Sequence, residues 1–153
     1  MAMTMQGEVT LPADRAKVWA ALNDPEVLKA CIPGCEELEK VSDTQFTATA
    51  KVAVGPVKAT FKGSVTLSDI DAPNGYTIAG EGQGGIAGFA KGGAKVRLMD
   101  DEGGTRLSYD VEAQVGGKIA QLGGRLINGV AKKYADQFFA NFAKVLAPAE
   151  NAA

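Results

Sequence analysis

A long amphipathic pattern at the C-terminal end of the chain, preceded by many short alternating segments, restricts the folds open to this sequence. From Gly116-Gly117 onward, apolar residues recur at steps of three or four, which predicts one helix of about 28 residues. An antiparallel sheet with one apolar face needs an element that covers this face, and the C-terminal helix is long enough to do so. The apolar positions of the helix are Ile119, Leu122, Leu126, Val130, Tyr134, Phe138, Phe142 and Val145.

The segments before this helix have the period of half-buried strands, interrupted by two short helices. Residues 4–11 alternate between polar and apolar side chains, which predicts a first strand. Pro12, Asp14 and the spacing of Val18, Trp19 and Leu22 then predict a short helix. A second one begins at Asp24-Pro25, an N-cap followed by a first-turn proline. From Glu36 onward six further strands are predicted, with turn signals at Ser42-Asp43, Gly55-Pro56, Pro73-Asn74-Gly75 and Asp100 to Gly104.

This order of elements predicts an α+β helix-grip fold. In this fold a curved seven-stranded antiparallel sheet surrounds a long C-terminal helix, and two short helices follow the first strand. The chain has 153 residues, which is the size of one domain. We therefore expect a single helix-grip domain over residues 1–147 and a short polar C-terminal end over residues 148–153.

The alternation also predicts which strand residues face the helix. The opposite choice of faces would bury charged residues such as Lys51, Lys95 and Asp110 without partners, which is costly. The predicted inner face then carries no ionisable side chain, so it cannot hold the acid and base of a catalytic pair. No catalytic residue is expected. Many inner residues are small: Ala48, Ala50, Ala59, Gly63, Gly80, Gly82 and Ala113.

Because protein interiors are normally close-packed, this surplus of small residues predicts a cavity that an apolar or amphipathic ligand occupies. The alternative interpretation is that the glycines permit sheet curvature and the helix packs closely on the sheet. The expected ligand-binding residues are Ala50, Phe61, Gly80, Tyr109 and Ala113 on the strands, Phe89 in the glycine-rich segment over residues 80–93, and Leu122, Leu126, Val130 and Tyr134 on the helix. The expected cavity mouth consists of Ile32, Pro33, Gly34 and Ile86, the last in a glycine-rich hairpin over residues 80–93.

The composition disfavours several other classes of function. The sequence has no histidine, which excludes Ser-His-Asp and Cys-His catalysis and removes the commonest metal ligand. Cys31 and Cys35 have a CxxxC spacing that is weak support for a metal site, so neither a metal nor a cofactor is expected. The net charge of −2 and the scattered basic residues disfavour nucleic-acid binding.

Two stretches resemble the signatures of the G-subunit family of carbon monoxide dehydrogenase. The stretch from Val18 to Glu39 is VWAALNDPEVLKACIPGCEELE, and the stretch from Leu122 to Phe142 is LGGRLINGVAKKYADQFFANF. The resemblance covers nearly the whole chain and implies a START-like domain of the SRPBCC superfamily. It further implies a non-catalytic accessory protein of a carbon monoxide dehydrogenase-type molybdenum hydroxylase, which aids membrane recruitment or electron delivery to a quinone pool. Together with the apolar cavity, it suggests an isoprenoid quinone as the ligand.

The sequence also bears on the location of the protein. Residues 1–11 lack the basic and apolar regions of a signal peptide, and no apolar run approaches the roughly 18 residues of a transmembrane helix. Some members of the resembled family carry an apolar anchor beyond the last helix, which this sequence does not show. We therefore expect a cytoplasmic protein with at most peripheral contact to the inner face of the cytoplasmic membrane.

Two other functions remain open at this stage. An enzyme like the polyketide cyclases and dehydratases of the same superfamily would use Tyr76, Tyr109 or Tyr134 with a loop carboxylate such as Asp24 or Glu26. A ligand-free assembly adaptor would instead bind the dehydrogenase through exposed apolar residues near the presumed mouth.

Overall fold

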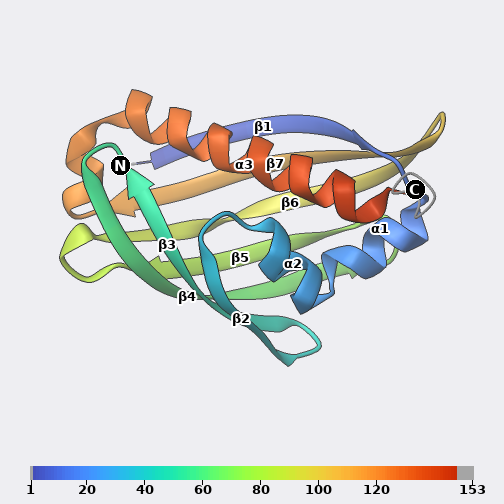
Figure 1. The fold of residues 1–153 in the computed structure, drawn as a ribbon, viewed down its shortest axis with the longest axis horizontal. Helices are drawn as coiled ribbons and strands as arrows, with labels where there is room; N and C mark the ends of the chain where they lie inside the picture. Colours follow the sequence, from blue (N-terminus) through green and yellow to red (C-terminus); the bar gives the residue numbers. More distant parts are fainter. Residues whose placement is uncertain (1, 148–153) are drawn as a thin grey trace.

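The computed structural model describes residues 2–147, so the predicted polar end over residues 148–153 lies outside the described residues. Seven strands form one antiparallel sheet in the order β1-β7-β6-β5-β4-β3-β2 (Figure 1). The strands are β1 (Ala2–Leu11), β2 (Cys35–Ser42), β3 (Gln45–Val54), β4 (Val57–Asp71), β5 (Gly75–Gln83), β6 (Phe89–Asp101) and β7 (Gly104–Gly116). The helices are α1 (Arg15–Leu22), α2 (Pro25–Cys31) and α3 (Gly124–Leu146), with 3₁₀ turns η1 (Gly85–Ala87) and η2 (Lys118–Leu122).

This architecture confirms the predicted helix-grip fold, including the two short helices after the first strand. Both short helices begin at the predicted aspartates. The Asp14 carboxylate accepts the N–H of Lys17 at 2.9 Å, and the Asp24 carboxylate accepts the N–H of Glu26 at 2.9 Å. Pro25 occupies the first turn of α2, where backbone N–H groups have no acceptor within the helix, so the absence of an N–H on proline costs no hydrogen bond.

The long helix begins later than the sequence pattern predicts. Gly117 and Gly123 have positive φ angles of 81° and 94°, which a continuous right-handed helix does not contain. They enclose η2, and α3 begins only at Gly124 and has 23 residues instead of about 28. The apolar spacing continues across this break, which is why periodicity alone could not locate it.

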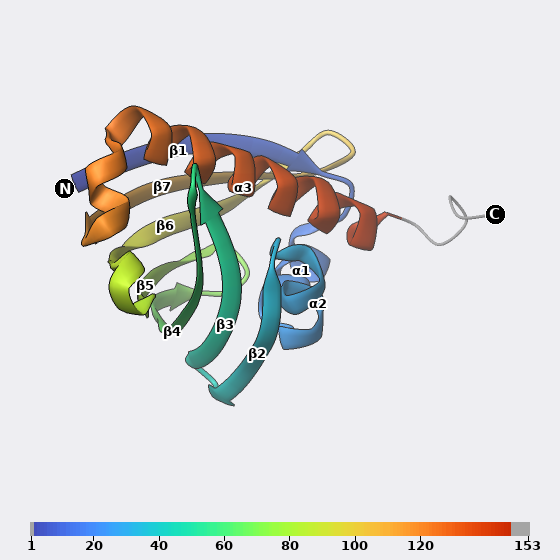
Figure 2. The same cartoon turned by 60° about the vertical axis from the view of Figure 1, so that its left-hand side comes forward.

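Helix α3 crosses the open side of the curved sheet, running along β1 toward α1 and α2 (Figure 2). Its C-terminal half is the more deeply buried, because Phe142 and Leu146 have almost no exposed surface. The other end of the molecule is closed by η1 and η2, which lie against each other. The sheet and α3 thus enclose an interior that is bounded by α1 and α2 at one end and by the 3₁₀ turns at the other.

Candidate ligand cavity

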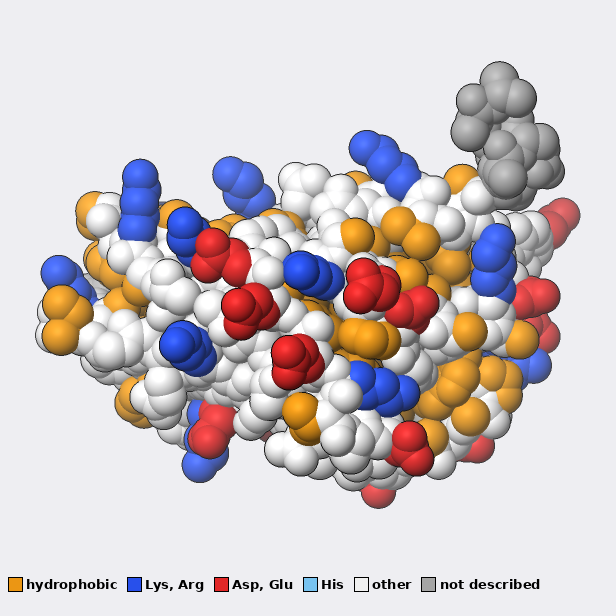
Figure 3. Space-filling model, turned by 60° about the horizontal axis from the view of Figure 1, so that its bottom comes forward, with side chains coloured by type: hydrophobic (Ala, Val, Ile, Leu, Met, Phe, Trp, Pro, Cys, Tyr) orange, Lys and Arg blue, Asp and Glu red, His pale blue; other side chains and the backbone are white. Residues whose placement is uncertain are grey.

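The faces of the sheet are as the sequence predicts. Lys51, Lys95 and Asp110 are exposed on the convex face, where basic and acidic side chains are interspersed in the view of Figure 3. Within the described part of the chain, the inward-facing positions in the middle of β3 to β7 carry no ionisable side chain other than tyrosine, and Asp100, near the end of β6, pairs with Arg15 at 2.8 Å. The concave face therefore offers an apolar surface to whatever lies beneath α3.

Two separate clusters of buried residues occupy the two ends of the interior. The packed end, next to α1 and α2, has a buried core of Leu11, Val18, Leu22, Cys31, Phe46, Leu67, Tyr76, Val96, Leu98, Leu107, Phe142 and Leu146. The 3₁₀ end has a buried core of Met3, Val54, Ala87, Val115, Ile119 and Ile127. The aromatic rings of Phe138 and Phe142 stack at 5.4 Å between centroids in the packed end.

A lane of small residues crosses the concave face between these clusters. The strand register aligns Ala48, Gly63, Gly82 and Ala90 in one row, and Gly80, Gly92 and Ala113 in the next. All seven, which we call the small-residue lane, are half-buried and retain accessible surface although they face inward. Side chains of this size contribute little volume to the space between the sheet and α3.

The glycines of the lane differ in whether the surrounding structure has room for a side chain. A Cβ at Gly63 would collide with the carbonyl oxygen of Glu81, so this glycine lets neighbouring backbones approach where the sheet bends. Gly92 is the same case, against the backbone of Glu112. A Cβ at Gly82 would instead meet its nearest atoms at an ordinary 3.9 Å. Sheet curvature, the alternative interpretation of the sequence, therefore explains Gly63 and Gly92 and leaves Gly82 with room for a side chain.

A groove runs along one flank of α3 beside the tip of the β3–β4 hairpin. It has a volume of about 540 Å³ and a mainly apolar lining. Leu126 is 37% exposed at this groove, and its side chain lies against Gly55 at the hairpin tip. We call this the α3 groove; it is lined by Leu122, Arg125, Leu126, Gly129, Val130 and Lys133.

Beyond the groove, three hydrogen bonds close the seam between α3, strand β3 and the loop after α2. Strand β2 pairs with β3 only up to Ala50. Beyond Ala50, the backbone N–H groups on this edge of β3 therefore have no neighbouring strand to donate to. The Lys51 N–H donates to the Gly34 carbonyl at 2.9 Å, and the Ala53 N–H donates to the Tyr134 hydroxyl at 3.2 Å. The Asn141 amide donates to the Cys31 carbonyl at 3.0 Å. Tyr134 therefore joins α3 directly to the edge of β3.

The three tyrosines do not share one site. Tyr76 lies in the packed end, 7% exposed and edge-on to Trp19, and burial raises its pKa to about 12. Tyr109 stacks on Phe139 at 5.4 Å between ring centroids, with its hydroxyl against Gly7 near β1. Tyr134 lies at the seam. The candidate carboxylate Asp24 caps α2 and Glu26 is exposed, and among the described residues neither is hydrogen-bonded to a tyrosine.

The structure separates the predicted binding residues into three groups. Ala50, Gly80 and Ala113 lie in or beside the small-residue lane, and Phe61 pairs with Ala50 across β3 and β4. On the helix side, Leu122, Leu126 and Val130 line the α3 groove, and Tyr134 follows at the seam. Tyr109, on β7, contacts the buried core of the packed end. Phe89 was also expected to contact the ligand. It instead alternates with Lys91 on the convex face of the sheet, where its ring covers Gly116.

The predicted mouth is also divided. Ile32, Pro33 and Gly34 belong to the loop after α2, beside the seam. Ile86 is 91% exposed on η1, which packs near η2 and the 3₁₀ end. The four residues therefore do not surround one opening. The sequence missed the hairpin tip at Gly55 and the Ala53 N–H, because neither has a chemically distinctive side chain.

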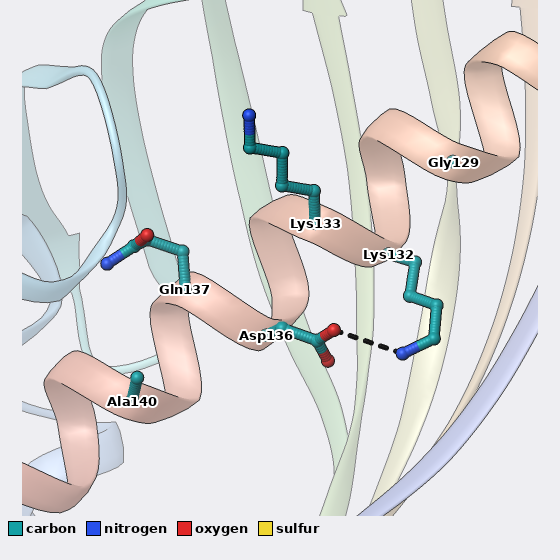
Figure 4. Close-up of a pocket in the computed structure, with 6 residues that line it drawn as sticks. All are labelled: Gly129, Lys132, Lys133, Asp136, Gln137 and Ala140. Atoms are coloured by element: carbon teal, nitrogen blue, oxygen red, sulfur yellow. Dashed lines mark hydrogen bonds and ion pairs between the residues drawn. The ribbon is translucent and has the colours of Figure 1, made fainter.

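The two thiols and the remaining surface hollow do not form a second site. Within residues 2–147, no group of three or more Cys, Asp or Glu side chains is placed to hold a metal ion. Cys31 and Cys35 are free thiols, and burial raises the pKa of each. A surface hollow of about 420 Å³ lies on the outer side of α3, where Lys132 pairs with Asp136 at 3.0 Å (Figure 4). Its lining includes the charged side chains of Lys132, Lys133 and Asp136, and it shares Gly129 and Lys133 with the α3 groove.

The whole chain can be compared with known proteins. A family model for the G subunit of carbon monoxide dehydrogenase (CoxG) matches residues 7–147. No curated protein matches the sequence. Among the helices of residues 2–147, none has the length and apolar character needed to cross a membrane.

Several solved structures have the same fold. A conserved protein from Geobacillus kaustophilus is 31% identical, with a TM-score of 0.88 and coverage of 94% of this chain and 95% of that one. Ara h 8.0201 is 23% identical, with a TM-score of 0.65 and coverage of 95% and 99%. The ZhuI aromatase/cyclase from Streptomyces sp. R1128 is 14% identical, with a TM-score of 0.68 and coverage of 95% and 94%. At these lower identities the likeness concerns the fold alone.

Proposed function

The chain belongs to the CoxG family of carbon monoxide dehydrogenase G subunits, and we propose that it carries an apolar or amphipathic ligand for a molybdenum hydroxylase of the carbon monoxide dehydrogenase type. In this proposal the protein has no catalytic role. It works in the cytoplasm, at most peripherally attached to the membrane, and assists membrane recruitment of the hydroxylase or electron delivery. An isoprenoid quinone is the ligand that suits such a role.

The observation that carries this proposal is the small-residue lane. An inward-facing surface of glycine and alanine that retains accessibility favours an occupant other than the side chains of the protein. The room beside Gly82 supports the same interpretation. Because the lane lacks charged groups, shape and burial of apolar surface would provide most of the affinity. Tyrosine hydroxyls and backbone groups at the rim would orient a polar head group.

The decisive experiment is solvent extraction and native mass spectrometry of the protein purified from its own host. A co-purifying quinone or other lipid supports the carrier, while repeated absence, together with no quenching of Trp19 fluorescence by added quinone, contradicts it.

Two variants then locate the ligand. Gly82→Val fills the space beside the lane and should abolish lipid co-purification without unfolding the protein, since valine favours strands. Ala79→Val, on the convex face of the same strand, is the matched control and should leave the bound lipid unchanged. If both variants retain the lipid, the ligand binds elsewhere in the protein.

The alternative is an enzyme, which the fold likeness to the aromatase/cyclase leaves open. Such an enzyme would depend on a tyrosine, and Tyr109 is the one nearest the middle of the concave face. Turnover of a candidate polyketide that falls in Tyr109→Phe would favour the enzyme. If turnover is unchanged in Tyr109→Phe, Tyr76→Phe and Tyr134→Phe, the enzyme alternative is wrong.

A further inference from the structure

Helix α3 contains a glycine that its fold does not require. Gly129 lies in the interior of the helix, where glycine is markedly less favourable than alanine. Its φ angle is not in the left-handed region, and a Cβ at this position would meet no atom of residues 2–147 within 4 Å apart from the adjacent helix backbone. Neither backbone conformation nor close packing therefore accounts for this glycine. Its effect is to leave a gap in the exposed surface of α3, which we call the Gly129 notch.

Two basic residues flank this notch. Arg125 and Lys133 lie four residues before and after Gly129, so all three share one face of the helix. Arg125 and Lys133 are about 12 Å apart along the helix axis, and their long side chains can reach the space above the notch from both sides. Both are exposed, and neither forms an ion pair with a carboxylate of residues 2–147. The notch thus lies between two positive charges that have no partner in this part of the chain.

The surrounding charges also favour a negative ligand. Residues 117–147 contain five basic residues and a single acidic one, Asp136, whereas the remaining residues contain eleven basic and seventeen acidic ones. Asp136 pairs with Lys132 at 3.0 Å, and Figure 4 shows that Lys133 points away from this pair. Helix α3 therefore presents a local positive field on a protein whose net charge is negative.

Apolar side chains lie beside the two cations. Leu122, Leu126 and Val130 line the same α3 groove, and Leu126 remains 37% exposed there. The groove volume of about 540 Å³ is in the range of sites for small molecules. An apolar strip beside two unpaired cations matches a small molecule that has an apolar chain and a negatively charged head group.

We propose that the α3 groove is a binding site for a single-chain amphiphile whose head group is an oxyanion, either a carboxylate or a phosphate. The guanidinium of Arg125 offers a planar fork of donors that matches two oxygens of such a head group, and Lys133 adds a second charge from the other side. The head group occupies the space above Gly129, and the chain lies on the three apolar residues of the groove. This site is on the flank of α3 and not in the small-residue lane, so it stands independently of the ligand proposed above.

The test is isothermal titration calorimetry with decanoate, decyl phosphate, decanol and decyltrimethylammonium, each below the concentration at which it forms micelles. At least one of the two anions should bind, and the tighter one identifies the head group. The uncharged and cationic compounds should bind roughly ten-fold more weakly or worse, because they cannot accept the charged hydrogen bonds. Arg125→Gln with Lys133→Gln should cause a similar loss for the anions. Lys91→Gln with Lys95→Gln removes the same charge from the convex face of β6 and should leave the affinity unchanged.

A change at the notch separates the site from the stability of the fold. Gly129→Gln fills the notch with a residue that favours helix, so it should raise the urea concentration at the midpoint of unfolding and still lower the affinity for the anions. Loss of binding in a more stable protein cannot be attributed to unfolding. Ala140→Gln, at another exposed position of α3, is the matched control and should retain the wild-type affinity.

Several outcomes would overturn the proposal. These are failure of both anions to bind, equal affinity for decanoate and decanol, and unchanged anion binding in Gly129→Gln or in the Arg125 and Lys133 double variant. Gly82→Val should leave anion binding intact; if it abolishes binding, the amphiphile occupies the lane and the groove site is wrong. A protein that binds an anion in the groove but never co-purifies with a lipid contradicts the carrier and leaves the groove site standing.

Discussion

The two regions of the concave face use the same strands and differ in how the space above them is filled. At the packed end, large side chains such as Leu107 and Phe142 are almost fully buried against α1, α2 and the second half of α3. A few residues further along the same strands, the members of the small-residue lane are only half-buried. One end of the sheet is thus filled with large buried side chains, while the lane between the two clusters carries only glycine and alanine.

The comparison shows how this fold can separate stability from binding. Stability depends on the dense end, where deletion of a methylene group leaves a void that cannot collapse. The lane contributes little apolar contact of its own, so changes there should alter occupancy more than folding. The variants below test this separation, beginning with the largest expected effect.

A matched pair of leucines gives the strongest test. Leu107→Ala, at 1% exposure in the packed end, should lower the free energy of unfolding by roughly 2–5 kcal/mol. Leu126→Ala, at 37% exposure in the α3 groove, should cost less than about 1 kcal/mol. Urea unfolding followed by circular dichroism measures both. Equal losses would mean that the groove is as much a part of the core as the packed end.

The packed end should also give the protein a sensitivity to alkali. Burial raises the pKa of Tyr76 to about 12, so its contribution to stability is fully present below pH 10 and is lost as the pH rises toward 12. The loss should reach about 3 kcal/mol. Thermal unfolding across this range should show a smaller decline for Tyr76→Phe than for the wild type. Tyr134→Phe, which leaves Tyr76 in place, should retain the full decline.

Alanine at two glycines of the lane should have effects of opposite sign. Gly63→Ala forces its methyl group into the Glu81 carbonyl and should destabilise the protein by about 2 kcal/mol. Gly82→Ala meets no close neighbour and should stabilise it by roughly 0.5–1 kcal/mol, because the unfolded chain loses conformational freedom. Chemical unfolding distinguishes the two. Destabilisation by both would mean that sheet curvature accounts for the whole lane.

The smallest expected effect on stability is at the seam. Tyr134→Phe removes the acceptor for the Ala53 N–H. Because Ala53 is exposed and water can replace the hydroxyl, the free energy of unfolding should fall by less than about 1 kcal/mol. Release of a bound fluorescent lipid, followed by stopped flow, should nevertheless become faster. An unchanged release rate would place the ligand path away from this seam.

The fold could be predicted because its signals are local. Alternation identified the strands and their faces, and Asp14 and Asp24 identified the starts of two helices. The start of α3 was predicted too early, because glycine is compatible with both a helix and the positive φ angle of Gly123. Phe89 was expected among the ligand contacts because the segment over residues 80–93 was interpreted as a mobile hairpin, whereas Phe89 pairs with Gln83 in the ladder between β5 and β6 and faces outward.

The arrangement of the candidate site depended on information that the sequence does not contain. Tyr134 and Ala53 are 81 residues apart, and their hydrogen bond depends on where β2 stops pairing with β3. Ile32 and Ile86 have similar apolar side chains, and only the path of the chain shows that they lie in different regions. Whether the lane holds a ligand stays a prediction.

The end of β3 beyond β2 has a consequence for the behaviour of the protein at high concentration. A bare strand edge can pair with the edge of another molecule, and sheet proteins normally cover such edges. Here the cover is a loop carbonyl and a single phenolic hydroxyl on a neighbouring helix. Each parting of the seam therefore uncovers a short template for intermolecular pairing. Solutions of the empty protein should turn cloudy sooner on storage than solutions of a filled one, in which a bound molecule holds the helix and strand together.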